Sequence, residues 1–411
     1  MFDPLTIAAL LLSAVSLFCA LYFSFAIAHV ARSVRTVPTL RAGLDGSIPE
    51  NDLPSVCIVV PAHNEADVIG KLAHSLREQQ YPKLHAVFSL DRCTDDTEKI
   101  VRETIDGDDR FEIVHAPQRP EGWAGKTHAV HSGVVASQRA HSAEMLLFTD
   151  ADTIFDPQCV RAAVGLLRKR NLDMLSLLST LTTDRWFERF VQPSAAMELM
   201  RQNPLLHINR TDSPKRFANG QFMLFTRDAY QAIGGHERVR ADILEDLAFA
   251  RALIGDERTV GVFVADGLLT CRMYRAWSEF VRGWKRIYIE SLRRRLHQLR
   301  GASLRLFATG VVLPTCSLGA IIVGASIGPT IVGVGAIACG ALGLLVWLTM
   351  YTLVYMLMRA PVWLAPLAPF GSLSVSWILF CAWRDLATGR GIAWAGVTYT
   401  PEGRKKRRRE R

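Results

Sequence analysis

Three long uncharged segments constrain the fold of this chain more than any other feature. Residues 5–29 contain no acidic residue, lysine or arginine, and residues 306–328 and 330–358 form two further uncharged runs that meet at Gly328-Pro329. Each run is long enough to cross the hydrocarbon core of a bilayer, about 30 Å thick, as a helix. The first run is longer than the apolar core of a signal peptide and no basic segment precedes it, so we expect a retained membrane anchor.

A fourth apolar segment, residues 361–383, differs from the other three. It contains three prolines, Pro361, Pro366 and Pro369, together with Gly371. Irregular backbone is tolerated at membrane depth only where protein or water satisfies its polar groups. We therefore expect this segment to be re-entrant or interfacial and not to cross.

Positive charges set the expected orientation. Arginines follow the first apolar run, precede the second and follow the third, and residues 404–411 hold seven basic residues against one acid. Because Lys and Arg near membrane segments favour the cytoplasmic side, we expect residues 32–305, Arg359 and the C-terminal tail there. An outside N-terminus, three crossings and a fourth segment that does not cross satisfy all of these charges. The expected location is the inner (plasma) membrane, with the segment 32–305 in the cytoplasm.

The net charge gives no support to nucleic-acid binding. The formal charge is +9, but residues 404–411 contribute +6 of it, so the rest of the chain is close to balance. A basic segment beside a membrane helix is typical of contact with anionic lipid. The eight cysteines form no Cys-x-x-Cys pair and four of them lie in the apolar end segments, which is typical of reduced, buried thiols.

The middle of the chain predicts an α/β domain. Between residues 54 and 265, short apolar runs alternate with segments of helical periodicity. The expected strands are residues 56–60, 85–90, 111–115 and 145–149, and the expected helices are residues 65–80, a segment around Ile100-Val101, and residues 127–138. This order is typical of a doubly wound, mostly parallel sheet, which binds ligands at the carboxyl ends of its strands.

Four polar groups follow those strand ends. They are the segment Pro61–Glu65, Asp91, the loop Gly122–Lys126, and the pair Asp150 and Asp152. Two carboxylates one residue apart suit Mg²⁺ or Mn²⁺ bridging a diphosphate, and a lysine on a glycine-rich turn can contact a phosphate. Asp91 can accept the N3–H of a uracil-type base. Each residue alone is equally a turn residue or a solvated charge, so it is their convergence on one edge that favours a nucleotide site.

Two common phosphate-binding patterns are missing from the sequence. Neither G-x-G-x-x-G nor G-x-x-x-x-G-K-[ST] occurs. Dinucleotide cofactors and P-loop chemistry therefore have no support.

These motifs, in this order, resemble the inverting glycosyltransferases of family 2, which have the GT-A fold. The resemblance begins at Val59-Val60-Pro61-Ala62-His63-Asn64-Glu65, continues through Asp91, Gly122-Trp123-x-Gly125-Lys126 and Asp150-x-Asp152, and extends to Ala218-Asn219-Gly220-Gln221-Phe222, Gly234-Gly235-His236-Glu237 and Ile243-Leu244-Glu245-Asp246. It covers residues 54–290. The pattern is similar to that of the membrane-bound branch that glycosylates lipids, the ceramide glucosyltransferases and the bacterial carotenoid- and hopanoid-associated enzymes.

The resemblance implies substrates and residue roles. The donor would be a nucleotide-diphosphate sugar, expected to be a UDP-sugar, with Mg²⁺ or Mn²⁺ as cofactor. Donor contacts would come from Pro61, Asn64, Glu65, Asp91 (to the base), Lys126, Asp150 (to the ribose or metal), Arg282 and Trp284, while Asp152 would ligate the metal. Asp246 would be the general base and Glu245 its neighbour.

The chain departs from the family at two positions. A second carboxylate usually precedes Asp91, where this chain has Leu90, and the Gln-x-x-Arg-Trp motif is reduced to Arg282-Gly283-Trp284. The first difference leaves one carboxylate for the base. The second argues against a processive polysaccharide synthase.

Two residues are candidates for contact with the acceptor, and each has a structural alternative. His236 follows two glycines, where a structural histidine is equally expected. Trp277 begins a helical stripe that continues through Phe280, Trp284, Ile287 and Tyr288. Such a stripe suits either an interfacial helix or packing against protein.

The expected organisation has five parts. These are an anchor (residues 1–31), a GT-A catalytic domain (32–270), an amphipathic interfacial region (271–305), C-terminal membrane helices (306–385) and a basic cytoplasmic tail (386–411).

The proposed role of Asp246 as a base places a condition on its pKa. An acid at a helix N-terminus has a lowered pKa, so burial and Glu245 would have to restore the basicity of Asp246.

The expected function is transfer of a sugar to a membrane lipid hydroxyl of sphingolipid, diacylglycerol, carotenoid or hopanoid type. One alternative within the class is a polyprenyl phosphate acceptor, for which Arg293–Arg295 could hold the phosphate. From other classes, a nucleotidyltransferase would need a glycine-rich triphosphate loop near the first strand, and a non-catalytic membrane scaffold would not need the paired carboxylates.

Overall fold

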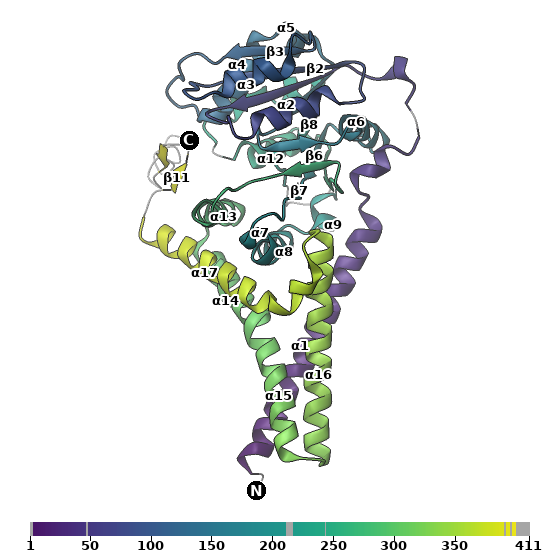
Figure 1. Cartoon of the computed structure of the whole chain (residues 1–411), viewed down its shortest axis with the longest axis vertical. Coiled ribbons are helices and arrows are strands. Elements are labelled where there is room, and N and C mark those ends of the chain that lie inside the picture. The colour runs from purple at the N-terminus through teal and green to yellow at the C-terminus, as the bar shows by residue number, and fades with distance from the viewer. Residues whose placement is uncertain are drawn as a thin grey trace. The chain divides into compact units, whose positions relative to one another are not determined.

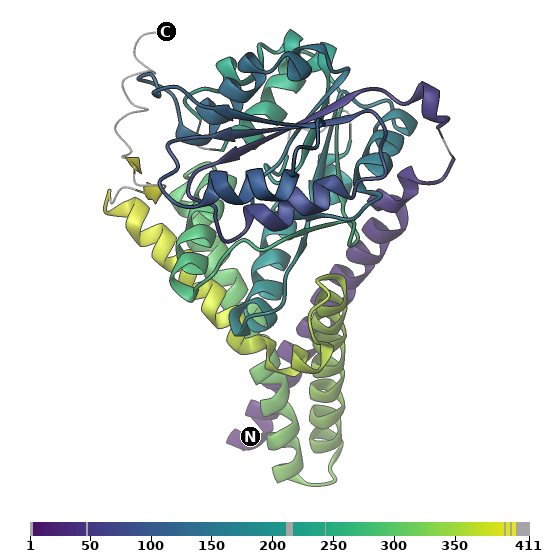
Figure 2. The same cartoon turned by 45° about the horizontal axis from the view of Figure 1, so that its top comes forward.

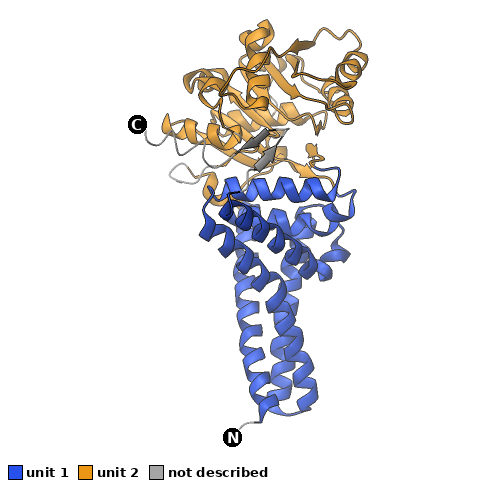
Figure 3. Ribbon diagram, turned by 90° about the vertical axis from the view of Figure 1, so that its left-hand side faces the viewer, with its two compact units in different colours: residues 1–35, 183–202, 274–411 blue, residues 36–182, 203–273 orange. Residues whose placement is uncertain are grey.

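The structure is a computed structural model that describes residues 3–46, 48–210, 217–242 and 244–389, and the backbone of residues 392–394 and 397–399. Its internal contacts divide the chain into two compact units (Figure 3). Unit 1 comprises residues 1–35, 183–202 and 274–411, and unit 2 comprises residues 36–182 and 203–273. The segment 183–202, which the sequence places inside the catalytic domain, thus belongs with the apolar ends. The basic tail, residues 404–411, and Ile243 lie outside the described residues.

A seven-stranded sheet forms the centre of unit 2 in the part of the chain that is described. Its order is β3-β2-β1-β4-β8-β6-β9, and its strands are β1 (Val56–Ala62), β2 (Leu84–Leu90), β3 (Phe111–His115), β4 (Met145–Phe148), β6 (Met174–Leu178), β8 (Met223–Thr226) and β9 (Val260–Val264). Strands β1 to β4 are parallel, and only β8 runs antiparallel to both of its neighbours. The predicted parallel-dominant α/β sheet is confirmed.

Both faces of this sheet are covered, which explains why its strands are continuous apolar runs. On β1, Val56, Ile58 and Val60 join one buried cluster with residues of α2 (Ile69–Arg77) and α6 (Cys159–Lys169). Cys57 and Val59 point the other way, into a cluster with residues of α4 (Gly125–Ala136) and α12 (Glu245–Gly255). Figure 2 shows helices on both faces of the sheet.

Shorter elements complete unit 2. They are η1 (Leu40–Gly43), η2 (Glu50–Asp52), α3 (Thr97–Ile105), α5 (Gln138–Ser142), β5 (Thr153–Phe155), β7 (Thr180–Leu181), α9 (Leu205–Ile208), α10 (Arg227–Ala232), α11 (Gly235–Arg238) and β10 (Leu269–Cys271). Strands β5, β10 and β7 form a small second sheet. This sheet starts directly after Asp152, whose backbone carbonyl accepts a hydrogen bond from the N–H of Arg272 at 3.2 Å.

Unit 1 is helical apart from a short hairpin. Its elements are α1 (Pro4–Thr36), α7 (Trp186–Phe190), α8 (Gln192–Gln202), α13 (Trp277–Ser291), α14 (Leu296–Phe307), the π-helix η3 (Ala308–Val312), α15 (Leu313–Ile327), α16 (Ile331–Leu357), η4 (Val362–Leu367), α17 (Ala368–Ala387), β11 (Ile392–Trp394) and β12 (Val397–Tyr399). Among the described residues, four segments are long and apolar enough to cross a membrane: Pro4–Thr36, Leu296–Ile327, Ile331–Leu357 and Val362–Ala387.

Small residues allow α1, α15 and α16 to pack closely side by side (Figure 1). A Cβ atom on Gly340 would lie 2.4 Å from the carbonyl oxygen of Ser317, and one on Gly343 would lie 2.6 Å from the Ser317 hydroxyl oxygen and 2.9 Å from the carbonyl oxygen of Ser16. Close approach at small residues is how apolar helices associate where the hydrophobic effect gives no net drive.

The aromatic stripe of α13 packs against protein. Phe280, Trp284 and Tyr288 are buried. The hydroxyl of Tyr288 donates a hydrogen bond to the carbonyl oxygen of Ala195 at 3.0 Å, and the ring of Phe280 lies 5.2 Å from that of Phe187. Of the two expectations for this stripe, packing is therefore the one observed, and the partners are the inserted helices α7 and α8.

Candidate active site

Lys126 lies at the centre of a group of carboxylates in unit 2. It stands in the first turn of α4, and its Nζ lies 2.6 Å from Oδ1 of Asp150 and 2.6 Å from Oε1 of Glu245. Asp150 follows the carboxyl end of β4 and Glu245 begins α12. Burial alone would lower the pKa of Lys126, but the two carboxylates outweigh that effect and raise it. Lys126 therefore remains a cation at any physiological pH.

Asp246 is held by the backbone on both sides. Its Oδ2 accepts a hydrogen bond from the N–H of Gly220 at 2.9 Å, and its Oδ1 accepts one from the N–H of Leu247 at 2.7 Å. Burial, and after it the charge of Glu245, raises the pKa of Asp246 to about 6. These are the two effects that the sequence argument required to offset the helix dipole. A carboxylate with this pKa is ionised at neutral pH and still basic enough to accept a proton.

Gly220 makes the approach of these groups possible. A Cβ atom on Gly220 would lie 3.0 Å from Nζ of Lys126, 3.3 Å from Oε1 of Glu245 and 3.4 Å from Oδ2 of Asp246. A side chain at this position would force these groups to shift by a few tenths of an ångström. Gly220 was not among the predicted site residues, although it lies inside the motif Ala218–Phe222, and that motif was the available signal.

Asp152 provides a carboxylate oxygen that lacks a partner. Its Oδ1 is buried and has no hydrogen-bond partner among the described residues. Burial, followed by the charges of Asp150 and Glu65, raises the pKa of Asp152 to about 7. A buried polar atom without a hydrogen-bond partner is rare in native proteins, and a bound ion is one of the common explanations.

The residues present fit a divalent cation that a donor helps to hold. In the described ranges, no group of three or more His, Cys, Asp and Glu side chains could hold a metal ion by itself. Mg²⁺, however, is commonly held by one or two carboxylates together with substrate phosphates and water. Asp152 and its neighbour Asp150 supply that number of carboxylates.

The segment after β1 and the end of β2 are connected by hydrogen bonds. Nδ1 of His63 lies 2.6 Å from the carbonyl oxygen of Asp91, and Oδ1 of Asn64 accepts a hydrogen bond from the N–H of Thr94 at 2.8 Å. The N–H of Glu65 donates to Oγ1 of Thr97 at 2.8 Å. Pro61 lies within β1, paired with β2. These contacts fix the first predicted motif against the second, at the same sheet edge.

Asp91 is covered by its chain neighbour. The Asp91 carboxylate accepts hydrogen bonds of 2.8 and 2.9 Å from the Arg92 guanidinium, and these bonds lower the pKa of Asp91. Arg92 has a positive φ of 50°, an uncommon conformation for a residue with a side chain. Arg92 was not among the predicted site residues, and a basic residue next to Asp91 was the only signal for it.

His236 is a core residue. Its ring is 1% exposed and lies 4.5 Å from the ring of Phe148 and 4.8 Å from that of Phe249. Nδ1 lies 2.8 Å from the hydroxyl oxygen of Tyr230. Burial, then His131 and Lys126, holds the pKa of His236 well below its usual value, so the ring is neutral. His236 therefore has the surroundings of a structural histidine, which was the alternative to contact with the acceptor.

The other three predicted residues belong to unit 1, whereas every residue discussed above belongs to unit 2. Arg282 is exposed on α13 and Trp284 is buried beneath it. The ring of Trp277 lies 5.1 Å from that of Trp186, which is 60% exposed.

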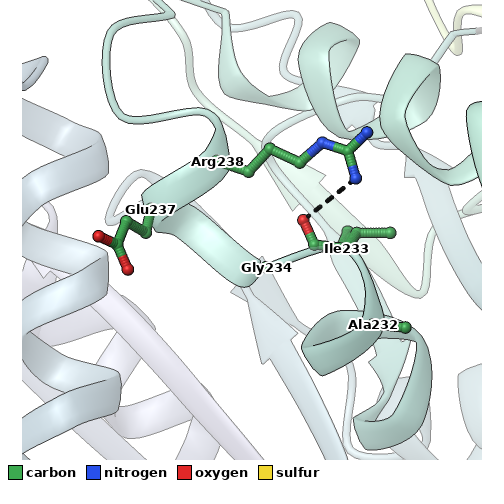
Figure 4. Close-up of a pocket in the computed structure, with 5 residues that line it drawn as sticks. All are labelled: Ala232, Ile233, Gly234, Glu237 and Arg238. Atoms are coloured by element: carbon green, nitrogen blue, oxygen red, sulfur yellow. Dashed lines mark hydrogen bonds between the residues drawn. The ribbon is translucent and has the colours of Figure 1, made fainter.

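A surface pocket lies apart from the carboxylates. It is lined by Ala232, Ile233, Gly234, Glu237 and Arg238 (Figure 4). The side chains of Glu237 and Arg238 point in opposite directions, and Arg238 binds Oδ2 of Asp256 at 2.9 Å. None of the carboxylates around Lys126 lines it.

A parallel-dominant sheet with helices on both faces and carboxylates at its carboxyl edge defines an α/β domain of the GT-A type. Residues 57–234 match the model of glycosyl transferase family 2. This segment, which is less than half of the chain, is therefore similar to the glycosyltransferases of family 2.

Curated relatives support the same class. Over 238 residues the chain is 27% identical to 4,4'-diaponeurosporenoate glycosyltransferase of Staphylococcus aureus. This match covers 56% of the present chain and 60% of the relative. The chain thus matches less than two thirds of the length of these relatives.

Solved structures of glycosyltransferases are also similar to the chain. A mannosyltransferase from Pyrobaculum calidifontis, in complex with GDP-Man and Mn²⁺, is 17% identical with a TM-score of 0.48, and the match covers 94% of this chain and 99% of that one. Glucosyl-3-phosphoglycerate synthase from Mycobacterium tuberculosis, in complex with Mn²⁺, UDP and phosphoglyceric acid, is 17% identical with a TM-score of 0.38, covering 62% and 81%.

Proposed function

We propose that this protein transfers a sugar from a nucleotide-diphosphate sugar, a UDP-sugar in the first instance, to a hydroxyl group of a membrane lipid, with inversion at the anomeric carbon. The observation that carries the proposal is the group around Lys126. One lysine faces Asp150, Glu245 and, further away, Asp152 and Asp246. The excess of negative charge at a sheet edge suits a site that takes up a cation together with a diphosphate.

Asp246 is the proposed general base. It takes the proton of the acceptor hydroxyl as that oxygen forms a bond to the anomeric carbon. The bond from that carbon to the diphosphate oxygen breaks on the opposite side, and the nucleotide diphosphate leaves with the bonding electrons. Because both Asp246 oxygens accept backbone N–H groups, the carboxylate is held in one orientation before the acceptor arrives.

Lys126 and the carboxylates after β4 are the proposed diphosphate end of the site. Asp152, with Asp150, would hold Mg²⁺ or Mn²⁺, which when bound offsets the charge of the leaving diphosphate. Lys126 contributes a fixed positive charge on the same side. At the other end, Asp91 accepts from the base, with Pro61, Asn64 and Glu65 beside the nucleotide and Arg282 and Trp284 proposed to support the diphosphate.

The membrane acceptor is proposed from the chain's composition and its relatives. In the part of the chain that the structure describes, four helices are long and apolar enough to cross a bilayer, which is more than an enzyme with a soluble acceptor would need. The Staphylococcus aureus relatives are named for 4,4'-diaponeurosporenoate. We propose that the catalytic domain faces the cytoplasm, as the positive charges predict. His236 is buried and Trp277 is the remaining candidate for acceptor contact.

The polyprenyl phosphate alternative has weaker support. Of the Arg293–Arg295 cluster, Arg294 is held by Glu290, with Nη2 2.6 Å from Oε1. Its charge is therefore already neutralised within α13 and the turn that follows it.

A donor screen tests the proposal. Detergent-purified full-length protein is heated with UDP, GDP, CMP and their common sugars, with and without Mn²⁺ or Mg²⁺. A ligand at 100 times its Kd stabilises by about 2.7 kcal/mol, a readily measured thermal shift. We expect a metal-dependent shift with UDP that Asp152→Ala loses and that Asp246→Asn retains. The exposed variant Asp45→Asn is the matched control. If no nucleotide shifts the melting temperature, the transferase proposal is wrong.

The acceptor is then identified with a radiolabelled donor and a total lipid extract. Label that enters the organic phase and resists mild acid indicates a hydroxyl acceptor. Label that mild acid releases indicates a sugar phosphate and favours the polyprenyl alternative. Asp246→Asn should show neither product.

A further inference from the structure

Helix α17 exposes a continuous apolar stripe. Phe370, Leu373, Trp377 and Phe380 follow one another in steps of three, four and three residues, and each is between 46% and 60% exposed. This spacing places all four on one face of a helix. The opposite face is buried, at Val375, Ile378, Leu379 and Ala382 among others. The stripe therefore lacks a covering partner among the described residues, while the rest of the helix is packed.

The three long helices give a depth scale for unit 1. The ring of Phe23 in α1 lies 6.3 Å from that of Tyr351 in α16, and a Cβ atom on Gly310 in η3 would lie 3.1 Å from the Tyr351 hydroxyl. Phe23, Gly310 and Tyr351 therefore lie at one level of the bundle. From Tyr351 back to Ile331 the helix is about 30 Å long, the thickness of a hydrocarbon core. A hydrocarbon core that begins at Ile331 would therefore have its other boundary near Tyr351.

The first turns of α17 lie at this same boundary. The Ser372 hydroxyl lies 2.8 Å from the hydroxyl of Tyr351. A Cβ atom on Gly371 would lie 2.5 Å from the carbonyl oxygen of Phe190 and 3.1 Å from the hydroxyl oxygen of Ser194. The chain reaches this point from the end of α16 through η4.

From there α17 runs along α14, away from α15. Ser376 exchanges hydrogen bonds of 2.8 and 2.9 Å with Ser303, which lies in α14 before the π-helix. Further on, Asp385 forms an ion pair with Lys285 of α13. A crossing helix would instead return beside α16 towards Ile331. Figure 1 shows α17 beside α14.

We propose that α17 does not cross the membrane but lies in the plane of its surface, with the stripe of Phe370, Leu373, Trp377 and Phe380 at the boundary between headgroups and acyl chains. This inference rests on the membrane-embedded function proposed above and goes beyond it. Amphipathic helices with Trp and Phe on one face bind at this depth, about 5–10 Å into the boundary region. The partner of the exposed stripe is the lipid surface.

Charged residues at both ends fit the same depth. Arg384 is exposed and continues the stripe one turn after Phe380, and Arg359 precedes η4. An arginine here can reach lipid phosphate while its stem stays beside acyl chains. In a crossing helix one of the two would face the opposite side of the membrane, against the bias of the other arginines.

A sidedness experiment separates the two arrangements. In a background without the eight native cysteines, Pro329→Cys lies in the turn between α15 and α16, and Thr388→Cys follows α17. A membrane-impermeant maleimide is added to sealed vesicles from one side, and then after permeabilisation. We expect the two positions to react from opposite sides. Reaction from the same side would mean that α16 and α17 both cross, and would overturn the inference.

A depth measurement gives the second test. Nitroxides are placed at Phe370, Leu373, Trp377 and Phe380, and at Val334, Leu345 and Met356 on the exposed face of α16 as the matched control. Accessibility to oxygen and to a water-soluble nickel complex reports depth. We expect one shallow depth for all four α17 positions and a deep maximum at Leu345. A deep maximum at Leu373 and Trp377 overturns the inference. Protection of the stripe from both reagents also overturns it, because a second copy of the chain would then cover it.

The native protein provides a check that needs no cysteine replacement. The difference in tryptophan fluorescence between the natural chain and Trp377→Phe isolates the signal of Trp377. Lipids brominated near the carbonyl group should quench this signal more than lipids brominated near the chain terminus. Stronger quenching by the deep label contradicts the proposal. If neither α16 nor α17 contacts lipid, the proposed membrane-embedded function is wrong. If α16 contacts lipid and only α17 lies at another depth, the inference about α17 alone is wrong.

Discussion

Nζ of Lys126 lies 2.6 Å from Oε1 of Glu245, whose side chain is 4% exposed. The same ammonium group lies at the same distance from Asp150. A glutamate so deeply buried requires a counter-charge, and α4 delivers it from a segment far away in the sequence. Lys126 therefore joins the loop after β4 to the start of α12, in addition to any contact it makes with a donor.

Lys126→Ala should lower both stability and activity. Without the ammonium group, Glu245 and Asp150 repel each other inside the site. Because Lys126 is one third exposed, we expect a loss of about 1–2 kcal/mol in the free energy of unfolding, less than for a fully buried pair. Thermal unfolding at pH 7.5 measures the effect.

Lys71→Ala is the control for that variant, since Lys71 is exposed on α2. Lys126→Arg should recover more of the stability than of the transfer rate, because it restores charge but not the position of the phosphate contact. Equal melting temperatures for Lys126→Ala and Lys71→Ala would contradict the structural role.

The rate of transfer should fall on the acidic side of neutrality. A general base works only when ionised, and the pKa of Asp246 is raised to about 6. Below that pH the ionised fraction, and with it the rate, drops about tenfold per unit. Initial rates from pH 4.5 to 8, at saturating donor and Mn²⁺, would show this limb. A flat profile down to pH 4.5 would exclude Asp246 as the base.

Gly220→Ala should impair transfer with little loss of stability. The added methyl group would stand 3.0 Å from Nζ of Lys126 and 3.4 Å from Oδ2 of Asp246, so these groups must shift by a few tenths of an ångström. A misplaced base costs on the order of 10–100-fold in rate. Steady-state kinetics should show the loss in kcat, with the melting temperature nearly unchanged.

Gly255→Ala provides the comparison, because no atom lies within 4 Å of its added methyl group. It should be neutral in rate and neutral or slightly stabilising. Wild-type activity in Gly220→Ala would mean that the Lys126 group tolerates displacement.

Arg92→Ala should strengthen nucleotide binding. A base that binds the Asp91 carboxylate must displace the Arg92 guanidinium, which is bound there at 2.8 and 2.9 Å. Partly exposed ion pairs contribute about 0.2–1 kcal/mol, so we expect up to about a fivefold lower Kd for UDP. Titration calorimetry measures it, with Arg102→Ala as the control for loss of a surface arginine. Weaker binding in Arg92→Ala would show that Arg92 contacts the nucleotide instead of competing with it.

The sequence predicted the parallel half of the sheet well. The expected strand 111–115 coincides with β3, and the strands expected at 56–60 and 85–90 differ from β1 and β2 by two residues or fewer. Continuous apolar runs bounded by turn residues suffice for that. The helix expected from residue 65 begins only at Ile69, and the N–H groups of Glu65 and Ala66 before it bond to side-chain oxygens of Thr97 and Asp95.

Other features depend on contacts that no local pattern contains. The four-residue strand β8 is too short for periodicity to reveal, yet it brings Gly220 beneath Asp246. The stripe of α13 and the stripe of α17 look alike in sequence, but α7 and α8 cover the first and no described residue covers the second. Periodicity identifies an apolar face and not what lies against it.

The close packing at Gly340 and Gly343 has a consequence for where the protein can work. Backbones held this tightly leave the α15 and α16 pair little freedom to lengthen or shorten, so its apolar length is set by its sequence alone. A bilayer much thicker than about 30 Å would have to thin locally, and one much thinner would make the helices tilt, each at a cost of fractions of a kcal/mol per ångström. If the pair crosses a bilayer, we expect the chain to favour membranes of matching thickness and its activity to depend on the length of the surrounding acyl chains.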